Sequence, residues 1–163
     1  MLKIYTDGSC LSKKDHPDKG KGGLGIIVTI NDEIVKKISK GYKNTTISRM
    51  EGMAVLFALQ ILDKTQKAEI ISDSQYIINS FNKNWLLKWE KENWVDLSKS
   101  EGKRLNYDIM QALLKEYRKF PKGNIKFTHV RGHGNVEGNC MADELASYKN
   151  FIEFEEDVKL NNF

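Results

Sequence analysis

The sequence lacks long apolar runs, paired cysteines and the order of a secretion signal. No stretch approaches the roughly 20 apolar residues that span a membrane, and the first 15 residues do not follow the charged, apolar and small-residue order of a signal peptide. The two cysteines, Cys10 and Cys140, lie far apart and form no CxxC pair, so we expect reduced thiols and no zinc site. There is no internal repeat or low-complexity block. These absences favour a cytoplasmic protein with no membrane partner.

Length and charge indicate one domain followed by an acidic tail. The chain has 163 residues, 40% of them hydrophobic, which suits a single core. Residues 151–163 carry four acids and one lysine, so the net charge of +4 conceals a charge of +7 on residues 1–150. A mildly basic body favours a polyanionic partner such as nucleic acid, although a lysine-rich solvated surface has the same composition.

The order of elements predicts an α/β fold. Residues 48–64 form an amphipathic helical pattern, with Ser48 available as the N-cap. Three strand-like runs precede this helix, and strand, helix, helix, strand and helix patterns follow it. The strands are expected at 3–6, 23–30, 33–42, 67–72 and 124–130, and the later helices at 74–83, 104–120 and 136–148. Such an order implies a mixed sheet with helices packed on it.

Two acids end strand-like runs in similar settings. Asp7 follows the apolar run of residues 3–6, and Asp73 follows the strand expected after the first long helix. A helical crossover would make these strands parallel neighbours, so both carboxylates would lie at the same edge of the sheet. Because two close carboxylates repel and burial adds to the cost, a hard divalent cation such as Mg²⁺ or Mn²⁺ suits this edge.

Two further acids are weaker candidates when each is considered alone. Glu51 lies in the first turn of the long helix beside its apolar stripe, where it can point towards the sheet edge or simply interact with the helix N-terminus. Asp143, in the segment GNCMADELA, has the setting of an ordinary surface helix acid.

Four segments together resemble the type-1 class of ribonuclease H over residues 1 to about 150. They are YTDGSC, TTISRMEGMAVLFAL, SDSQYI and HVRGHGNVEGNCMADELA, in this order. The resemblance implies a mixed five-stranded sheet with helices packed on it and a tryptophan-containing handle, forming the catalytic domain. It also implies an endonuclease that hydrolyses the RNA strand of RNA/DNA hybrids with two Mg²⁺ ions, leaving 5′-phosphate ends. We expect Mn²⁺ to substitute and the protein to act as a monomer.

Position by position, the resemblance assigns the metal-binding and catalytic acids to Asp7, Glu51, Asp73 and Asp143. Asp7 would bridge two ions, Glu51 and Asp73 would bind one, and Asp143 would bind the other, partly through water. His133 matches the family's catalytic mobile-loop histidine. With a usual pKa near 6.5 it could shuttle a proton, and the alternative is a solvated loop histidine without a role.

The same matching implies residues that bind the substrate: Gly8, Ser9, Thr46, Gln75, Trp85, Asn106 and Asn139. Thr46 and Asn106 would hold a DNA phosphate. Gln75 would contact the RNA strand across the minor groove, where 2′-hydroxyls distinguish RNA from DNA. Asn139 would contact the RNA backbone near the cut.

The handle and the start of the long helix depart from the family pattern. In NWLLKWEKENW, lysines alternate with glutamates, so the handle is nearly neutral. We expect Trp85 to contact deoxyribose, whereas for Trp89 a core position is equally compatible. Ile47 stands where polar amide side chains are commoner, so it either leaves a minor-groove contact unmade or packs into the core.

Two rival functions remain at this stage. A hybrid-binding module with reduced catalysis would keep the fold, but clustered carboxylates are of no benefit to a protein that only binds polyanions. A junction resolvase or integrase-type strand transferase would share the superfamily, and the SDSQ segment, the handle and the GH loop argue against both.

Overall fold

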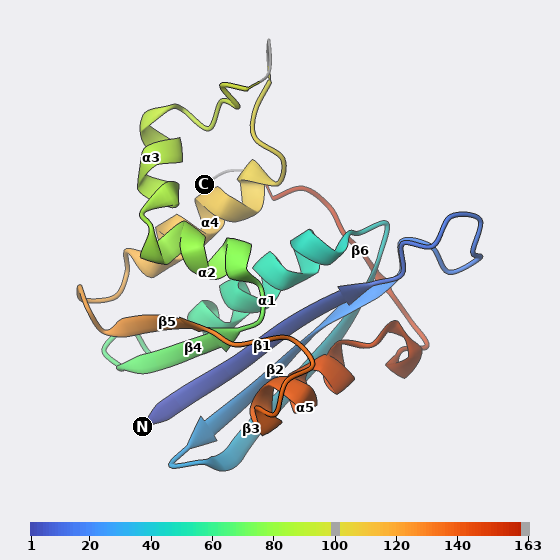
Figure 1. Cartoon of the computed structure of the whole chain (residues 1–163), viewed down its shortest axis with the longest axis horizontal. Helices are drawn as coiled ribbons and strands as arrows, with labels where there is room; N and C mark the ends of the chain where they lie inside the picture. Colours follow the sequence, from blue (N-terminus) through green and yellow to red (C-terminus); the bar gives the residue numbers. More distant parts are fainter. Residues whose placement is uncertain (99–101, 161–163) are drawn as a thin grey trace.

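The protein is built on one mixed sheet, seen in a computed structural model that describes residues 1–98 and 102–160 (Figure 1). β1 (Leu2–Cys10), β2 (Gly22–Ile30) and β3 (Glu33–Lys43) form consecutive antiparallel pairs. β4 (Ala68–Ser72) lies parallel to β1, and β5 (Ile125–His129) lies parallel to β4. The predicted mixed α/β architecture is therefore confirmed.

A sixth strand corrects the expected number of five. β6 (Glu155–Glu156) comes from the C-terminal tail and pairs parallel with the end of β3, so the strand order is β5-β4-β1-β2-β3-β6. Two consecutive glutamates carry no strand pattern, and only their pairing with Tyr42 and Lys43 makes them part of the sheet. This part of the tail is therefore joined to the edge of the sheet.

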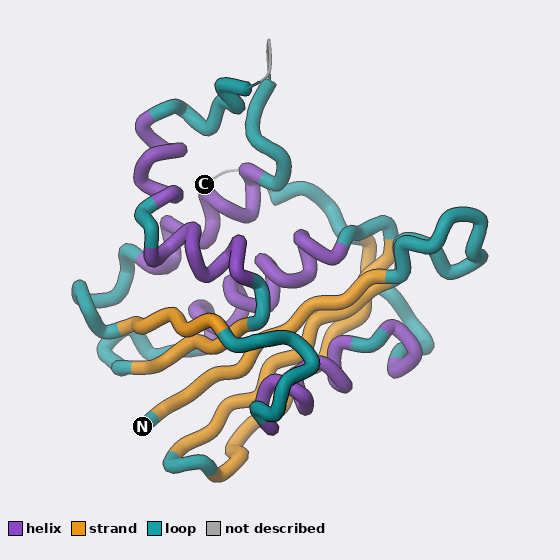
Figure 2. Tube along the Cα trace, viewed as in Figure 1, coloured by secondary structure: helices purple, strands orange, loops and turns teal. Residues whose placement is uncertain are grey.

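Helices cover both faces of the sheet, as the tube in Figure 2 shows. α1 (Ile47–Ile61), α2 (Gln75–Asn82) and α4 (Tyr107–Tyr117) lie on one side, with α3 (Trp85–Lys91) next to α2 and α4. α5 (Glu137–Ala146) packs on the opposite side against β1 and β2, and the 3₁₀ turn Tyr148–Asn150 follows it. The central strands are consequently enclosed between two layers of helix.

The first helix begins earlier than the sequence pattern predicts. Thr46, in extended conformation, is the N-cap, and its Oγ1 accepts a hydrogen bond of 3.3 Å from the backbone N–H of Arg49. The Ser48 N-cap assignment was therefore wrong: Ser48 already lies inside the helix, and its hydroxyl accepts from Asn106 instead. Ile47 is 53% exposed, so its expected alternative position in the core is also wrong.

The main core lies between the sheet and the helices of the α1 side. Its fully buried large side chains are Ile4, Leu24, Ile26, Met50, Leu59, Ile70, Ile77, Ile78, Ile109 and Leu113. Burial of each such side chain contributes about 1.5–3 kcal/mol, which fixes α1 across β1 and β2. Among the helices described, none has the length and apolar character needed to cross a membrane.

Candidate active site

The sheet register brings the two strand-end acids to neighbouring positions. β1 and β4 are parallel, and Thr6 pairs with Ser72, so Asp7 and Asp73 are the next residues on adjacent strands. Asp7 is only 5% exposed, whereas Asp73 is partly exposed. The predicted parallel pairing is confirmed, but Asp7 does not end its strand, because β1 continues to Cys10 and only its pairing with β4 stops at Thr6.

Glycines on both faces of the sheet allow two helices to bring further acids to Asp7. A Cβ at Gly8 would collide with backbone atoms of Met50 and Glu51 in α1. A Cβ at Gly25, the partner of Asp7 on β2, would collide with the carbonyl oxygen of Ala142 in α5. The backbones beside Glu51 and Asp143 therefore approach the central strands from opposite sides, which places four acids at one edge.

The carboxylates interact strongly even without a cation. Burial, a hydrogen bond with Asp143 and the charges of Asp73 and Asp143 raise the pKa of Asp7 to about 9, although the N–H of Gly8 acts in the opposite direction. Burial also raises the pKa of Glu51, partly offset by a hydrogen bond from Ser74, and the charge of Asp73 adds to the increase. A bound cation would offset this repulsion.

The donor set fits a hard divalent ion because all four candidate groups are carboxylates. Within residues 1–98 and 102–160, however, no three His, Cys, Asp or Glu side chains are already arranged to hold one metal ion. These carboxylates would therefore have to converge further around an ion.

Two histidines adjoin this edge: His129 is the last residue of β5, and His133 lies in the segment that follows. The backbone passes close to Asp73, since a Cβ at Gly132 would lie 3.0 Å from Asp73 Oδ2. His133 follows, exposed and with a positive φ of 55°. His129 is exposed and its Nε2 lies 3.2 Å from the backbone oxygen of Asp73. The strand register that puts His129 beside Ser72 is not visible in the sequence.

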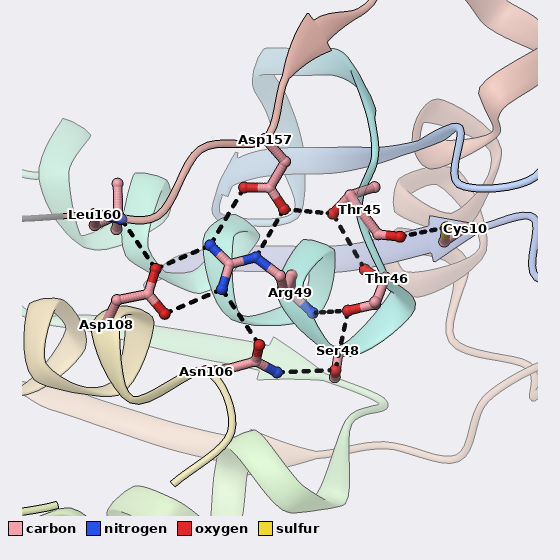
Figure 3. Close-up of polar contacts among 9 residues, drawn as sticks. All are labelled: Cys10, Thr45, Thr46, Ser48, Arg49, Asn106, Asp108, Asp157 and Leu160. Atoms are coloured by element: carbon pink, nitrogen blue, oxygen red, sulfur yellow. Dashed lines mark hydrogen bonds and ion pairs between the residues drawn. The ribbon is translucent and has the colours of Figure 1, made fainter. Parts of the chain in front are cut away.

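The residues matched to a DNA-phosphate site lie together at the start of α1. Asn106 Nδ2 donates to Ser48 Oγ at 3.1 Å, and Ser48 Oγ lies 3.3 Å from Thr46 Oγ1 (Figure 3). Thr46 and Asn106 line a pocket of about 510 Å³ together with Lys103, Arg104 and Lys159. Sequence reasoning missed the contribution of Arg49 and Asp157, which also line this pocket, because their contacts join segments far apart in the chain.

Other residues matched to substrate contacts are in varied surroundings. Gln75 is exposed at the start of α2, and Ser9 Oγ donates to the carbonyl of Ala146 at 2.6 Å. Gly8 is buried against α1. Asn139 is 2% exposed, and its Oδ1 has no hydrogen-bond partner among the described residues. Its proposed contact with RNA would therefore require local movement.

The handle contains one accessible tryptophan and two buried ones. Trp85 is partly exposed, whereas Trp89 and Trp94 belong to the core, which confirms the core interpretation of Trp89. The ring of Tyr76 lies 5.9 Å from both Trp85 and Trp89, and the Arg104 guanidinium lies 4.7 Å from the Trp89 ring. Trp85 is therefore the tryptophan most able to meet a ligand.

The mixed sheet and its flanking helices define a ribonuclease H-like α/β domain with an acidic sheet edge. Two solved structures share the fold over 89% of the chain. LC9-RNase H1, a type 1 RNase H with the type 2 active-site motif, aligns with a TM-score of 0.71 and 24% identity over 69% of its own chain. The PFV RNase H domain aligns with a TM-score of 0.70 and 27% identity over 91% of its chain.

The chain belongs to the ribonuclease H family. The family model described as RNase H matches residues 1–150. Ribonuclease H of Caldicellulosiruptor saccharolyticus is 42% identical over 88% of this chain and 91% of its own length. Ribonuclease H of Actinobacillus pleuropneumoniae is 38% identical over 90% of this chain and 88% of its own length. Ribonuclease HI of Haemophilus ducreyi is 37% identical over 89% of this chain and 87% of its own length. The protein is therefore a ribonuclease, and hydrolysis of RNA in RNA/DNA hybrids is the reaction its family indicates.

Proposed function

We propose that this chain cuts the RNA strand of RNA/DNA hybrids internally, using two Mg²⁺ ions and leaving 5′-phosphate ends. The observation that carries this mechanism is the convergence of four acids from β1, α1, α5 and the end of β4, together with the raised pKa of Asp7. When bound, two divalent cations would supply the charge that activates water and stabilises the departing 3′ oxygen. Mn²⁺, with similar ligand preferences, should replace Mg²⁺.

Each acid has a distinct proposed role set by its position. Asp7, central and almost fully buried, would contribute to holding both ions. Glu51 and Asp73 would hold one ion, and Asp143, on the opposite face, would help to hold the other. Buried carboxylates that repel one another are expensive to keep together, and binding the ions offsets this cost.

His133 is the proposed proton shuttle. It is exposed in the segment whose Gly132 adjoins Asp73, so its ring can reach solvent and the neighbourhood of the sheet edge. A histidine titrates near neutral pH and can transfer a proton to or from water or the product.

The remaining matched residues are proposed to contact the two strands of the hybrid. Thr46 and Asn106 line the pocket proposed to hold a DNA phosphate. Trp85 would contact deoxyribose, Gln75 the RNA strand, and Gly8, Ser9 and Asn139 the RNA near the cut. We propose a catalytic domain at residues 1–150, a C-terminal tail at 151–163, a monomeric state and a cytoplasmic location.

A cleavage assay with matched duplexes tests this function. In Mg²⁺ the protein should cut a labelled RNA/DNA hybrid and leave double-stranded DNA of the same sequence intact. The new 5′ end that the cut creates should accept a phosphate label only after phosphatase treatment. Binding of the hybrid without cleavage in Mg²⁺ or Mn²⁺ would instead support the catalytically reduced binding module.

A further inference from the structure

Arg49 uses its whole guanidinium group within the protein (Figure 3). Nε and Nη2 donate to Asp157 at 2.7 and 3.3 Å. Nη2 and Nη1 donate to Asp108 at 2.9 and 3.0 Å, and Nη1 also donates to Asn106 Oδ1 at 3.2 Å. A guanidinium has five N–H donors, and these five hydrogen bonds can use all of them.

The Arg49 cluster is buried as well as saturated. The side chains of Arg49, Asp108 and Asp157 are 11%, 6% and 2% exposed. The adjacent carboxylates hold the pKa of Arg49 above its usual range, and Arg49 holds the pKa of Asp108 below its usual range despite burial. With its donors engaged and its charge surrounded by two carboxylates, Arg49 is poorly suited to bind a phosphate itself.

The cluster determines which way the Asn106 amide points. Because a guanidinium can only donate, the Asn106 atom that it contacts must be the carbonyl oxygen. The amide nitrogen is then directed to the other side, where one N–H donates to Ser48 Oγ at 3.1 Å and the second remains for another acceptor. Without Arg49, the amide could rotate by half a turn and present its oxygen, which a phosphate would repel.

The C-terminal tail supplies one of the two carboxylates that hold Arg49. β6 brings Asp157 beside α1, where its backbone N–H donates to Lys43 O at 3.1 Å and its Oδ2 accepts from Thr45 Oγ1 at 2.7 Å. Three residues later, the N–H of Leu160 donates to Asp108 Oδ2 at 3.0 Å. The tail thus fixes both acidic partners of Arg49.

We propose that Asp157 is a positioning residue for nucleic-acid binding: through Arg49 it holds the Asn106 amide so that an N–H group faces a phosphate of the DNA strand. This inference rests on the proposed function, in which Thr46 and Asn106 form that phosphate site. It assigns the acidic tail a role in recognising substrate, and it places no residue of the tail in contact with the reacting atoms.

Kinetics of Asp157→Ala on an RNA/DNA hybrid test this role against a matched change, Glu155→Ala. Glu155 lies two residues before Asp157, in β6, and has the same charge, but its ion pair is an exposed one with Lys40 at 3.9 Å. Asp157→Ala should raise KM about tenfold because the phosphate contact of Asn106 is weakened. Its kcat should stay within about twofold of the wild type, because the four acids at the sheet edge are unchanged. Glu155→Ala should match the wild type. Arg49→Lys, which keeps the charge but cannot make the five bonds, should behave as Asp157→Ala does.

Hybrids with one uncharged methylphosphonate at successive positions of the DNA strand separate positioning from mere stability. In the wild type, neutralising the bound phosphate should raise KM about tenfold, equivalent to about 1.4 kcal/mol. Circular dichroism should first show that Asp157→Ala and Arg49→Lys are folded at the assay temperature. In these two variants, the same methylphosphonate hybrid should raise KM by no more than about twofold over the unmodified hybrid.

The possible outcomes distinguish the two proposals. If a methylphosphonate at one position raises the KM of the wild type and of both variants by the same factor, the phosphate site is supported and the positioning role of Asp157 is wrong. If no position affects the wild type, the phosphate site itself is wrong and the inference fails with it. A lower KM in Asp157→Ala would show that the tail competes with nucleic acid, which also overturns the proposal.

Discussion

Replacing Gly25 with alanine should displace α5 from the sheet and impair catalysis more than stability alone explains. The added Cβ would lie 2.9 Å from Leu145 Cβ and 3.0 Å from Ala146 N, and closer still to the carbonyl oxygen of Ala142. Ordinary contact begins at 3.4 Å, so the helix must move outward by about 1 Å. Such overpacking typically costs about 1–3 kcal/mol of stability.

The same movement should carry Asp143 away from Asp7. A misplacement of about 1 Å can cost about a hundredfold in rate, which corresponds to a barrier increase of about 2.7 kcal/mol. We therefore expect Gly25→Ala to fold and to bind hybrid, but to show a kcat about a hundredfold below the wild type in Mg²⁺.

Single-turnover cleavage, with the melting temperature measured in parallel, checks this expectation. Gly41→Ala is the matched control: on the neighbouring strand β3, its Cβ would meet the ring of Phe151 at 2.5 Å, so the conflict involves a side chain and leaves α5 in place. It should lose stability and keep kcat within about threefold of the wild type. A folded Gly25→Ala protein with wild-type kcat would refute the reasoning that close packing of α5 positions Asp143.

Five other predictions concern Asp7, the metal ion, His133 and Ile47. Asp7→Asn should cut at under about a tenth of the wild-type rate, a barrier increase above about 1.4 kcal/mol. The pKa of Asp7 is about 9 in the folded protein and 3.8 ordinarily, so the free energy of unfolding of the metal-free wild type should fall as pH rises from 3.8 to about 9. In Asp7→Asn the free energy of unfolding should depend less steeply on pH. Ca²⁺ should bind without efficient turnover because its longer bonds misplace the attacking water; strong cleavage in Ca²⁺ free of Mg²⁺ would contradict this. His133→Ala should lower kcat at unchanged hybrid affinity. Unaltered turnover between about pH 6 and pH 9 would show that His133 is a solvated loop residue without a catalytic role. Ile47→Asn, in an Asp7→Asn background with Ca²⁺, should tighten hybrid binding severalfold in titrations at fixed salt, since a gained hydrogen bond is worth about 0.5–1.5 kcal/mol; unchanged affinity would show that no contact is missing there.

Local patterns in the sequence were sufficient for most of the fold and for its family. Apolar alternation and helical spacing depend on near neighbours in the chain, so they located β1 to β5 and the helices α1, α2, α4 and α5 to within a few residues. The four motif segments identified the ribonuclease H family, which the comparisons confirm. Even the parallel pairing of β1 with β4, which sets Asp7 beside Asp73, followed from the crossover between them.

Only the tertiary structure decided the contacts between distant segments. Gly8 and Gly25 carry no signal of which helix they admit, because the steric conflict exists only once α1 and α5 are packed. In the sequence the tail is only an acidic segment, yet the pairing of β6 with β3 brings Asp157 to Arg49 across 108 positions of sequence. A buried guanidinium needs several acceptors at fixed angles, and those of Arg49 come from residues 106–108 and from the tail. The sequence specifies each of those groups, but folding alone sets them in contact.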